Sequence, residues 1–155
     1  MTPKPPRTSP QTTSPTNLVF TRESAAVFAS DWIEAWNSRD LDRIISHYAD
    51  DVVLVSPFVR RLMGGVDEKV CGVAALRAYF ARGLNAYPDL RFVLRRTYCG
   101  VRSLVLEYKS VSNLLTAELM EFNDSGLVCR VHAHYTAAPS AGAFPRKLRF
   151  EDGPL

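Results

Sequence analysis

The sequence has no apolar run long enough to cross a bilayer. A spanning helix needs about 20 predominantly apolar residues, and the uninterrupted apolar stretches of this chain are far shorter. The opening residues, MTPKPPRTSPQTTSPT, carry no apolar segment behind their basic residues, so they do not have the pattern of a secretory signal. These two absences predict a cytoplasmic protein with no membrane partner.

Cysteine is scarce, and no two cysteines have the close spacing of a metal site. The three cysteines, Cys71, Cys99 and Cys129, are widely spaced and form no CxxC pair of the kind found in zinc sites. Cys129 lies in an apolar segment and Cys99 beside one, so both are expected to serve as small hydrophobic residues. His132 and His134 have an i, i+2 spacing that could hold a metal, but no third ligand is evident. A sheet-face contact or a subunit interface is favoured for them, and no metal or cofactor is predicted.

A basic face is also absent. The net charge is +3, but five of the 19 basic and two of the 16 acidic residues lie in segments 1–20 and 139–155, which leaves 14 of each sign between them. Proteins that bind nucleic acid present a basic surface on their folded part. The neutral central part therefore argues against a nucleic-acid partner.

The length of 155 residues fits one domain with a sizeable core. Residues 1–18 are rich in Pro, Ser and Thr and lack apolar periodicity, so they are predicted to be disordered. We expect a single folded domain over residues 19–138 and a C-terminal tail over residues 139–155.

Three helices are predicted in the first part of this domain. The first begins after Thr21, a suitable N-cap, and runs to about Asn37 with apolar residues at helical spacing. Asp40 caps a short second helix. The third follows Gly72 and ends at the YPD sequence of residues 87–89, because a proline disfavours a helical residue before it.

The rest of the domain is predicted to consist mainly of strands, which outnumber the helices. Asp50-Asp51 is expected to turn the chain into a strand near Val52–Phe58, and residues 59–71 are expected to form a turn or hairpin loop around Gly64-Gly65. Alternating apolar and polar residues predict further strands, at about 90–95, 104–109, 115–122 and 127–136. This order predicts an α+β fold with helices packed on one face of a curved sheet.

The last hairpin places one acidic residue on an apolar face. Closing its loop over Asn123–Gly126 sets Glu118 opposite Val131. Period-2 alternation then puts on one face the residues Glu118, Met120, Phe122, Leu127, Cys129, Val131, Ala133 and Tyr135. A carboxyl group in such surroundings tends to keep its proton, and a pKa raised in this way lets it act as a general acid or base near neutral pH. The alternative is an ion pair or solvent contact at the rim.

Three segments carry a family resemblance. In chain order they are DWIEAWNSRDLDRIISHYADDVVLVSPF, GVAALRAYFARGL and AELMEFNDSGLVCRVHAHY, within about residues 24–136. They resemble the nuclear transport factor 2-like superfamily, most closely its SnoaL-like branch, which is similar to ketosteroid isomerase in fold. The resemblance implies a cone-shaped, curved mixed or antiparallel sheet wrapped around three N-terminal helices, a cystatin-like α+β barrel. It also implies an apolar pocket at the open end and a homodimer formed through the sheet.

The resemblance preserves one catalytic position and loses another. In ketosteroid isomerase the general-base aspartate immediately precedes the proline matched by Pro57, and here that position is Ser56, which is not a base. Trp32 takes the place of the oxyanion-hole tyrosine, and its indole N–H can donate but is not acidic. Glu118 takes the place of the protonated carboxyl of the oxyanion hole. Steroid isomerisation by that mechanism is therefore not expected.

We expect the pocket to bind a small, largely apolar molecule. Besides Glu118, the predicted lining consists of Trp32, Tyr48, Leu54, Ser56, Phe58, Tyr79, Phe80, Leu106, Tyr108, Met120, Val131, Ala133 and Tyr135. In an enzyme this pocket would support cofactor-free acid/base chemistry, such as isomerisation, dehydration, cyclisation or hydrolysis, with Glu118 handling the proton and Tyr108, Trp32 or Ser56 orienting the substrate. The alternative is a non-catalytic ligand-binding or dimerisation module, which the missing base favours. This fold hosts both kinds of protein, so the sequence leaves both open.

Overall fold

The computed structural model describes residues 19–136. Its elements follow the chain in the order α1 (Arg22–Asn37), α2 (Leu41–Ile45), β1 (Tyr48–Val55), α3 (Val59–Met63), β2 (Lys69–Cys71), α4 (Val73–Ala86), β3 (Val93–Gly100), β4 (Ser103–Lys109), the 3-10 turn η1 (Val111–Asn113), β5 (Leu115–Phe122) and β6 (Val128–Tyr135). The predicted tails, 1–18 and 139–155, lie outside the described residues. Within residues 19–136, no helix combines the length and apolar character that a membrane crossing requires.

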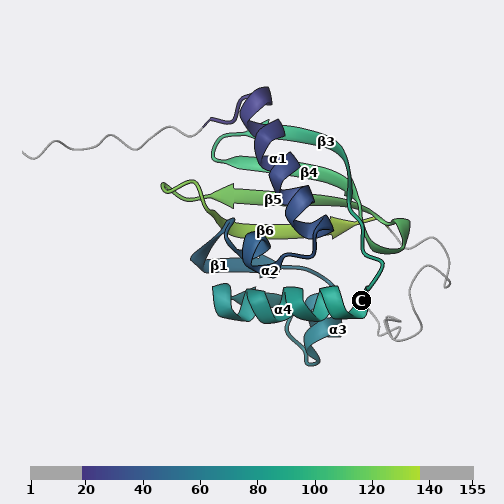
Figure 1. Ribbon diagram of the computed structural model, residues 1–155. Coiled ribbons are helices and arrows are strands. Elements are labelled where there is room, and N and C mark those ends of the chain that lie inside the picture. The colour runs from purple at the N-terminus through teal and green to yellow at the C-terminus, as the bar shows by residue number, and fades with distance from the viewer. Residues whose placement is uncertain (1–18, 137–155) are drawn as a thin grey trace, which may run out of the picture.

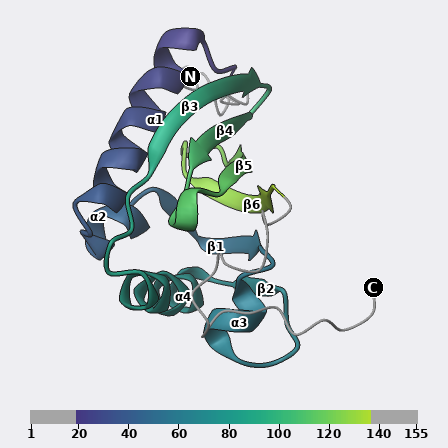
Figure 2. The same cartoon turned by 90° about the vertical axis from the view of Figure 1, so that its right-hand side faces the viewer.

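The six strands form one sheet in the order β2-β1-β6-β5-β4-β3. Every neighbouring pair is antiparallel except β1 and β6, which are parallel. Figure 1 shows α1 crossing one face of this sheet, with α4 beyond the β1 end. The view in Figure 2 shows the sheet bending from β3 towards β1, so that the helices lie on its concave side. The predicted α+β fold with a curved mixed sheet is therefore confirmed.

The three predicted helices, α1, α2 and α4, begin directly after the residues that were predicted to precede them. The side chain of Thr21 accepts a hydrogen bond from the backbone N–H of Ser24, and the hydroxyl of Ser24 accepts one from the N–H of Thr21. Asp40 likewise accepts from the N–H of Arg43 at the start of α2. Gly72 precedes α4 with a φ of 86°, a conformation that glycine adopts without strain.

Three segments after α2 differ from the prediction, and one of them is β3, which spans Val93–Gly100 where a strand was predicted at about 90–95. Strand β1 begins at Tyr48, so Asp50 and Asp51 lie inside the strand with exposed side chains and do not form a turn. An irregularity in the pairing with β6, between Tyr48 and Val53, accommodates them. Residues 59–71 contain the helix α3 and the strand β2, which the sequence did not predict because each is too short to show a period.

The predicted register of the last hairpin is wrong by two residues. Glu118 pairs with Ala133, not with Val131. Phe122 already pairs with Val128 in place of Leu127, and a bulge between Glu121 and Phe122 shifts the pairing by one residue more. A shift by two residues leaves Val131, Ala133 and Tyr135 of β6 on the same face as before. Glu118 therefore still shares its face with Ala133, and its predicted apolar surroundings are retained.

The bulge also changes which residue enters the core. Val128 is buried where Leu127 and Cys129 were expected to be, and these two are partly exposed. Cys99 is exposed as well, on the edge strand β3. The expectation that Cys99 serves as a small hydrophobic residue is therefore wrong, whereas Cys129 is partly buried.

Candidate functional site

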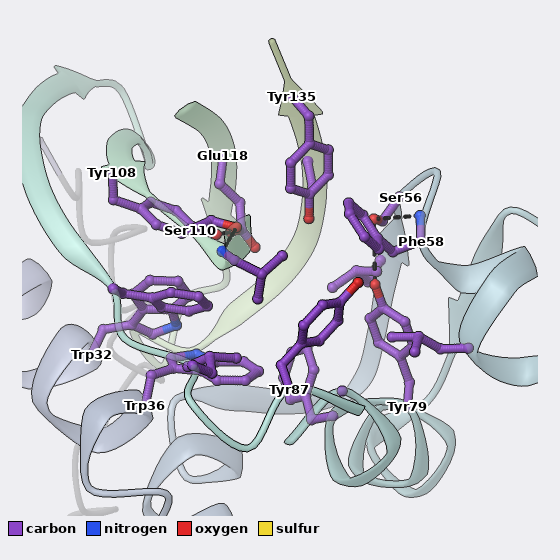
Figure 3. A pocket seen from close by; sticks show the side chains of 18 residues that line it. Trp32, Trp36, Ser56, Phe58, Tyr79, Tyr87, Tyr108, Ser110, Glu118 and Tyr135 are labelled. Atoms are coloured by element: carbon purple, nitrogen blue, oxygen red, sulfur yellow. Dashed lines mark hydrogen bonds between the residues drawn. The ribbon is translucent and has the colours of Figure 1, made fainter. Parts of the chain in front are cut away.

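A cavity lies between the concave face of the sheet and the helices. Its volume is about 70 Å3, which is room for a handful of water molecules at roughly 10–15 Å3 each. Figure 3 shows the side chains around it. Its lining is mostly aromatic and consists of Trp32, Trp36, Leu54, Ser56, Phe58, Leu62, Tyr79, Phe80, Gly83, Tyr87, Leu90, Phe92, Tyr108, Ser110, Val111, Glu118, Ala133 and Tyr135.

The structure brings together most of the residues that the sequence singled out. Those that reach the cavity are Trp32, Leu54, Ser56, Phe58, Tyr79, Phe80, Tyr108, Glu118, Ala133 and Tyr135. Four others, Tyr48, Leu106, Met120 and Val131, are buried but do not line it. Strand alternation assigns a residue to the inward face without fixing its position along the cone, so these four fill the core around the cavity.

Sequence reasoning missed eight lining residues. Trp36 follows Trp32 by one helical turn, so the spacing that selected Trp32 could have found it. Gly83 similarly lies one turn beyond Tyr79. Leu62 belongs to the unpredicted α3. The remaining five lie in the connections before β3 and after β4, and they are Tyr87, Leu90, Phe92, Ser110 and Val111. The alternation of Leu90 and Phe92 predicted a strand and not a cavity wall, and the other three carry no periodic signal.

The acidic group of the cavity is Glu118. Its side chain projects inward from β5 and the residue is 5% exposed. The hydroxyl of Tyr108, on the neighbouring strand β4, donates a hydrogen bond to Oε2 of Glu118 over 2.5 Å. Burial raises the pKa of Glu118 to about 7, and the bond from Tyr108 opposes part of that rise. Both protonation states of this carboxyl are therefore accessible near neutral pH.

Ser56 lies across the cavity in a group of hydroxyls. Its Oγ accepts from the backbone N–H of Phe58 over 3.2 Å and from the hydroxyl of Tyr79 over 3.3 Å (Figure 3). Burial raises the pKa values of Tyr79 and Tyr135, and hydrogen bonding with Ser56 offsets part of each rise. These phenols therefore remain protonated at neutral pH. Ser56 thus anchors a turn and a hydroxyl group and provides no base.

The indole N–H of Trp32 is already engaged. Its Nε1 donates to the hydroxyl of Tyr48 over 2.9 Å, and both residues are buried. The ring of Trp32 still lines the cavity, where it stacks on Phe92 with the ring centroids 5.7 Å apart. Trp32 therefore contributes a flat apolar wall, and its indole N–H is directed to Tyr48.

No metal-binding constellation is found among the described residues. Within residues 19–136, no group of three or more His, Cys, Asp and Glu side chains is suitably placed. His132 and His134 lie on the convex face of the sheet, opposite Leu119 and Ala117 of β5, and point away from the cavity.

The curved mixed sheet, the helices on its concave side and the cavity between them define a protein of the nuclear transport factor 2-like class. The family model described as a SnoaL-like domain matches residues 29–152, and the chain belongs to this family.

Solved structures agree with this assignment. A SnoaL-like protein of unknown function from Burkholderia thailandensis is 33% identical, with a TM-score of 0.73, and the match covers 77% of this chain and all of the other. A candidate ketosteroid isomerase from Kribbella flavida is 21% identical with a TM-score of 0.58, covering 86% and 92% of the two chains. An NTF-2 like protein of unknown function from Burkholderia xenovorans is also 21% identical, with a TM-score of 0.56 over 77% and 88%. The last two likenesses establish the fold alone. No curated protein matches the chain.

Proposed function

We propose that the protein binds a small, largely apolar molecule in this cavity and exchanges a proton with it through Glu118. The observation that carries the proposal is the buried carboxyl of Glu118, whose pKa is raised to about 7 inside an aromatic cavity. A group with a pKa near the working pH is effective both as an acid and as a base. Tyr108 positions this carboxyl through its hydrogen bond.

The chemistry that fits is a cofactor-free proton transfer. Isomerisation, dehydration, cyclisation and hydrolysis each include a step that one carboxyl group can catalyse. The hydroxyls of Tyr79 and Tyr135 stay protonated and supply hydrogen bonds, not a second base. Glu118 would therefore have to act as donor and acceptor in turn, or share the reaction with water.

A second candidate, a non-catalytic binding module, is favoured by one observation. The position that holds the base in ketosteroid isomerase is Ser56, whose hydroxyl is engaged by Phe58 and Tyr79. A binding module needs the same apolar cavity but no proton transfer, so the two candidates differ only in what Glu118 does.

The test uses a substrate that reports a base and nothing else. A benzisoxazole opens to a cyanophenol when one proton is removed from its ring carbon, and the product absorbs visible light once a nitro group is present. We expect 5-nitrobenzisoxazole to be opened faster than in buffer, with a rate that rises with pH around 7 as Glu118 ionises. The Glu118→Gln variant should abolish the excess rate, and Glu121→Gln, which changes an exposed residue on the other face of β5, should not. Equal rates for the wild type and Glu118→Gln would leave the binding module as the function.

We further propose that two copies associate through the convex face of the sheet. The helices lie on the concave side, and the convex face presents partly exposed apolar residues on adjacent strands, such as Val105 opposite Leu119. An uncovered face of this kind is a frequent site of association.

A further inference from the structure

Four hydroxyl groups gather on the side of the cavity away from Trp32 and Tyr108. Figure 3 shows the hydroxyls of Tyr79 and Tyr87 side by side there, below Ser56, with the hydroxyl of Tyr135 directed into the cavity beside them. Tyr79 and Tyr135 both form hydrogen bonds with Ser56. Burial raises the pKa values of these two phenols, and the proximity of Tyr87 raises each of them further. The four hydroxyls, of Ser56, Tyr79, Tyr87 and Tyr135, therefore form one group, called here the hydroxyl cluster.

Two protons of the hydroxyl cluster have no acceptor. Oγ of Ser56 accepts from the N–H of Phe58 and from the hydroxyl of Tyr79, which occupies both of its lone pairs. Ser56 can therefore only donate in its hydrogen bond with Tyr135, so the proton of Tyr135 is left over. The hydroxyl of Tyr87 is buried and, among the described residues, has no hydrogen-bond partner. Tyr87 and Tyr135 can thus each donate a hydrogen bond to a molecule in the cavity.

A cation lies near the unpartnered hydroxyl of Tyr87. Burial raises the pKa of Tyr87 to about 12, and the charge of Arg61 on α3 offsets part of the rise, so Arg61 favours negative charge at this position. Arg61 is partly exposed and does not line the cavity. Its field therefore reaches the hydroxyl cluster while its own guanidinium stays partly hydrated.

The geometry points to a subsite for one negatively charged group. We propose that the hydroxyl cluster binds the carboxylate of a small apolar monocarboxylic acid, with Tyr87 and Tyr135 each donating to one of its oxygens. A carboxylate only accepts hydrogen bonds, and its two oxygens match two donors. One nearby cation offsets one negative charge, which disfavours a dianion such as phosphate. The hydrocarbon part of the acid would lie against the aromatic wall of Trp32 and Phe92. This inference rests on the proposed binding function and adds the chemical class of the ligand.

A bound carboxylate shares the cavity with Glu118. Among the described residues, the titratable groups that act on Glu118 or feel its charge are the phenols of Tyr48, Tyr79, Tyr108 and Tyr135, and burial raises the pKa of each. All four are neutral near pH 7, so none offsets the repulsion between two carboxylates. Glu118, whose pKa is about 7, must therefore take up a proton when the acid binds at higher pH, and the affinity falls as the pH rises.

The test compares two molecules of one shape and different charge. Pivalate and 2-methyl-2-nitropropane share a tert-butyl group and a planar group with two oxygens, but only pivalate is an anion. Neither carries a hydrogen on the carbon beside that group, so Glu118 finds no acidic C–H proton to remove. We expect pivalate to bind about tenfold more tightly in 1H–15N titrations at pH 6, because hydrogen bonds to charged acceptors are the stronger ones.

A variant that keeps the aromatic ring measures the donor. Tyr87→Phe should weaken pivalate binding about tenfold, the effect of one hydrogen bond to a charged group, and should weaken binding of the nitro compound by less than about threefold. Without ligand, Tyr87→Phe should resist urea at least as well as the wild type, because the lost hydroxyl has no partner in the protein. Tyr98→Phe, which alters an exposed tyrosine on β3, is the matched control and should change neither affinity.

The contribution of Arg61 is tested through its charge. Arg61→Gln should weaken pivalate binding and leave binding of the nitro compound unchanged. Arg61→Lys restores a cation and should recover most of the affinity for pivalate. Arg60→Gln changes an exposed neighbour on the same helix and should have no effect on either molecule.

The pH dependence reports the proton on Glu118. Between pH 7 and pH 9 the affinity of the wild type for pivalate should fall progressively, because Glu118 must be protonated for the acid to bind. Glu118→Gln carries no such charge and should bind pivalate equally well across this range. The affinity for the nitro compound should not fall in this way in either protein.

Several results would overturn the inference. Equal affinities for the two molecules at pH 6 would leave the hydroxyl cluster as a site for ordered water. Equal effects of Tyr87→Phe on both affinities, full pivalate affinity in Arg61→Gln, or a wild-type affinity that does not fall above pH 7 would each overturn it as well. If neither molecule binds but 5-nitrobenzisoxazole is opened through Glu118, the inference alone fails. If that reaction is also absent, the proposed function fails with it.

Discussion

The hydroxyl of Tyr108 and the carboxyl of Glu118 form a buried pair 2.5 Å apart, and a second tyrosine–glutamate pair lies on the opposite face of the same sheet. There, Tyr98 donates to Glu107 over 3.2 Å in an exposed position. Glu107 and Tyr108 are adjacent in β4, so alternation sends one outward and the other into the cavity. The inner pair is buried, whereas the outer pair is exposed and lies beside the cation of Arg96, so the outer pair serves as an exposed control for the inner one.

The first prediction concerns stability against pH. Because the folded pKa of Glu118 is raised from 4.5 to about 7, the protonated form is favoured in the folded state. Its contribution is therefore complete below pH 4.5 and is lost as the pH rises through 7, by about 3 kcal/mol in total. Glu118→Gln should remove this loss and be more stable than the wild type at pH 8, with a smaller difference at pH 4.5.

Urea unfolding of both proteins across pH 4–9 measures this difference. The control is Glu121→Gln, which alters an exposed carboxyl on the same strand and should keep the wild-type pH dependence. An identical pH dependence in the wild type and Glu118→Gln would mean that the carboxyl of Glu118 is hydrated in the folded protein.

The second prediction concerns the hydrogen bond from Tyr108. This bond lowers the pKa of Glu118 against the effect of burial, so Tyr108→Phe should raise that pKa above 7. Carbon-13 NMR of the glutamate side-chain carboxyl groups, with Glu118 assigned through Glu118→Gln, follows the titration directly. Tyr98→Phe, which breaks the exposed pair, should leave the Glu118 midpoint unchanged. A midpoint that falls in Tyr108→Phe would contradict the geometry.

The third prediction concerns the support of the cavity wall. The amide of Asn37 accepts from the backbone N–H of Phe92 over 2.7 Å and donates to its carbonyl over 2.9 Å. Asn37→Ala should leave both backbone groups unpaired and lower the free energy of unfolding by about 2–3 kcal/mol. Asn37→Asp keeps the acceptor and loses the donor, so its loss should be smaller. Equal losses for the two variants in urea unfolding would show that the contacts at Phe92 are not what matters at this position.

The sequence predicted the fold through local signals. Caps such as Thr21 and Asp40, and long runs of alternating residues, are fixed by neighbours within a few positions. Glu118 was predicted as a candidate site residue for the same reason, because a single acidic residue on an alternating apolar face can be recognised from the sequence alone.

The features that escaped prediction depend on distant contacts. The bulge between Glu121 and Phe122 follows from how the hairpin packs, and no turn residue signals it. Tyr87 and Phe92 reach the cavity because Arg39 and Asn37, about 50 residues earlier, hold their backbone. Such contacts leave no periodic pattern of their own, so the alternation that includes Phe92 predicted a strand and did not reveal that this residue lies in a connection and lines the cavity.

The last prediction concerns association through the convex face. Leu119 of β5 lies between Val105 of β4 and His132 of β6 in the sheet register, and all three are partly exposed. If two copies pair there, Leu119→Glu places two like charges in an interface that excludes water, which desolvation opposes strongly. We expect the wild type to sediment as a dimer at micromolar concentration and Leu119→Glu as a folded monomer. Val27→Glu makes a similar change at a residue 72% exposed on α1, away from the sheet, and should remain dimeric. A wild-type monomer, or a Leu119→Glu dimer, would show that this face does not join two copies, while a Val27→Glu monomer would move the interface to the helical side.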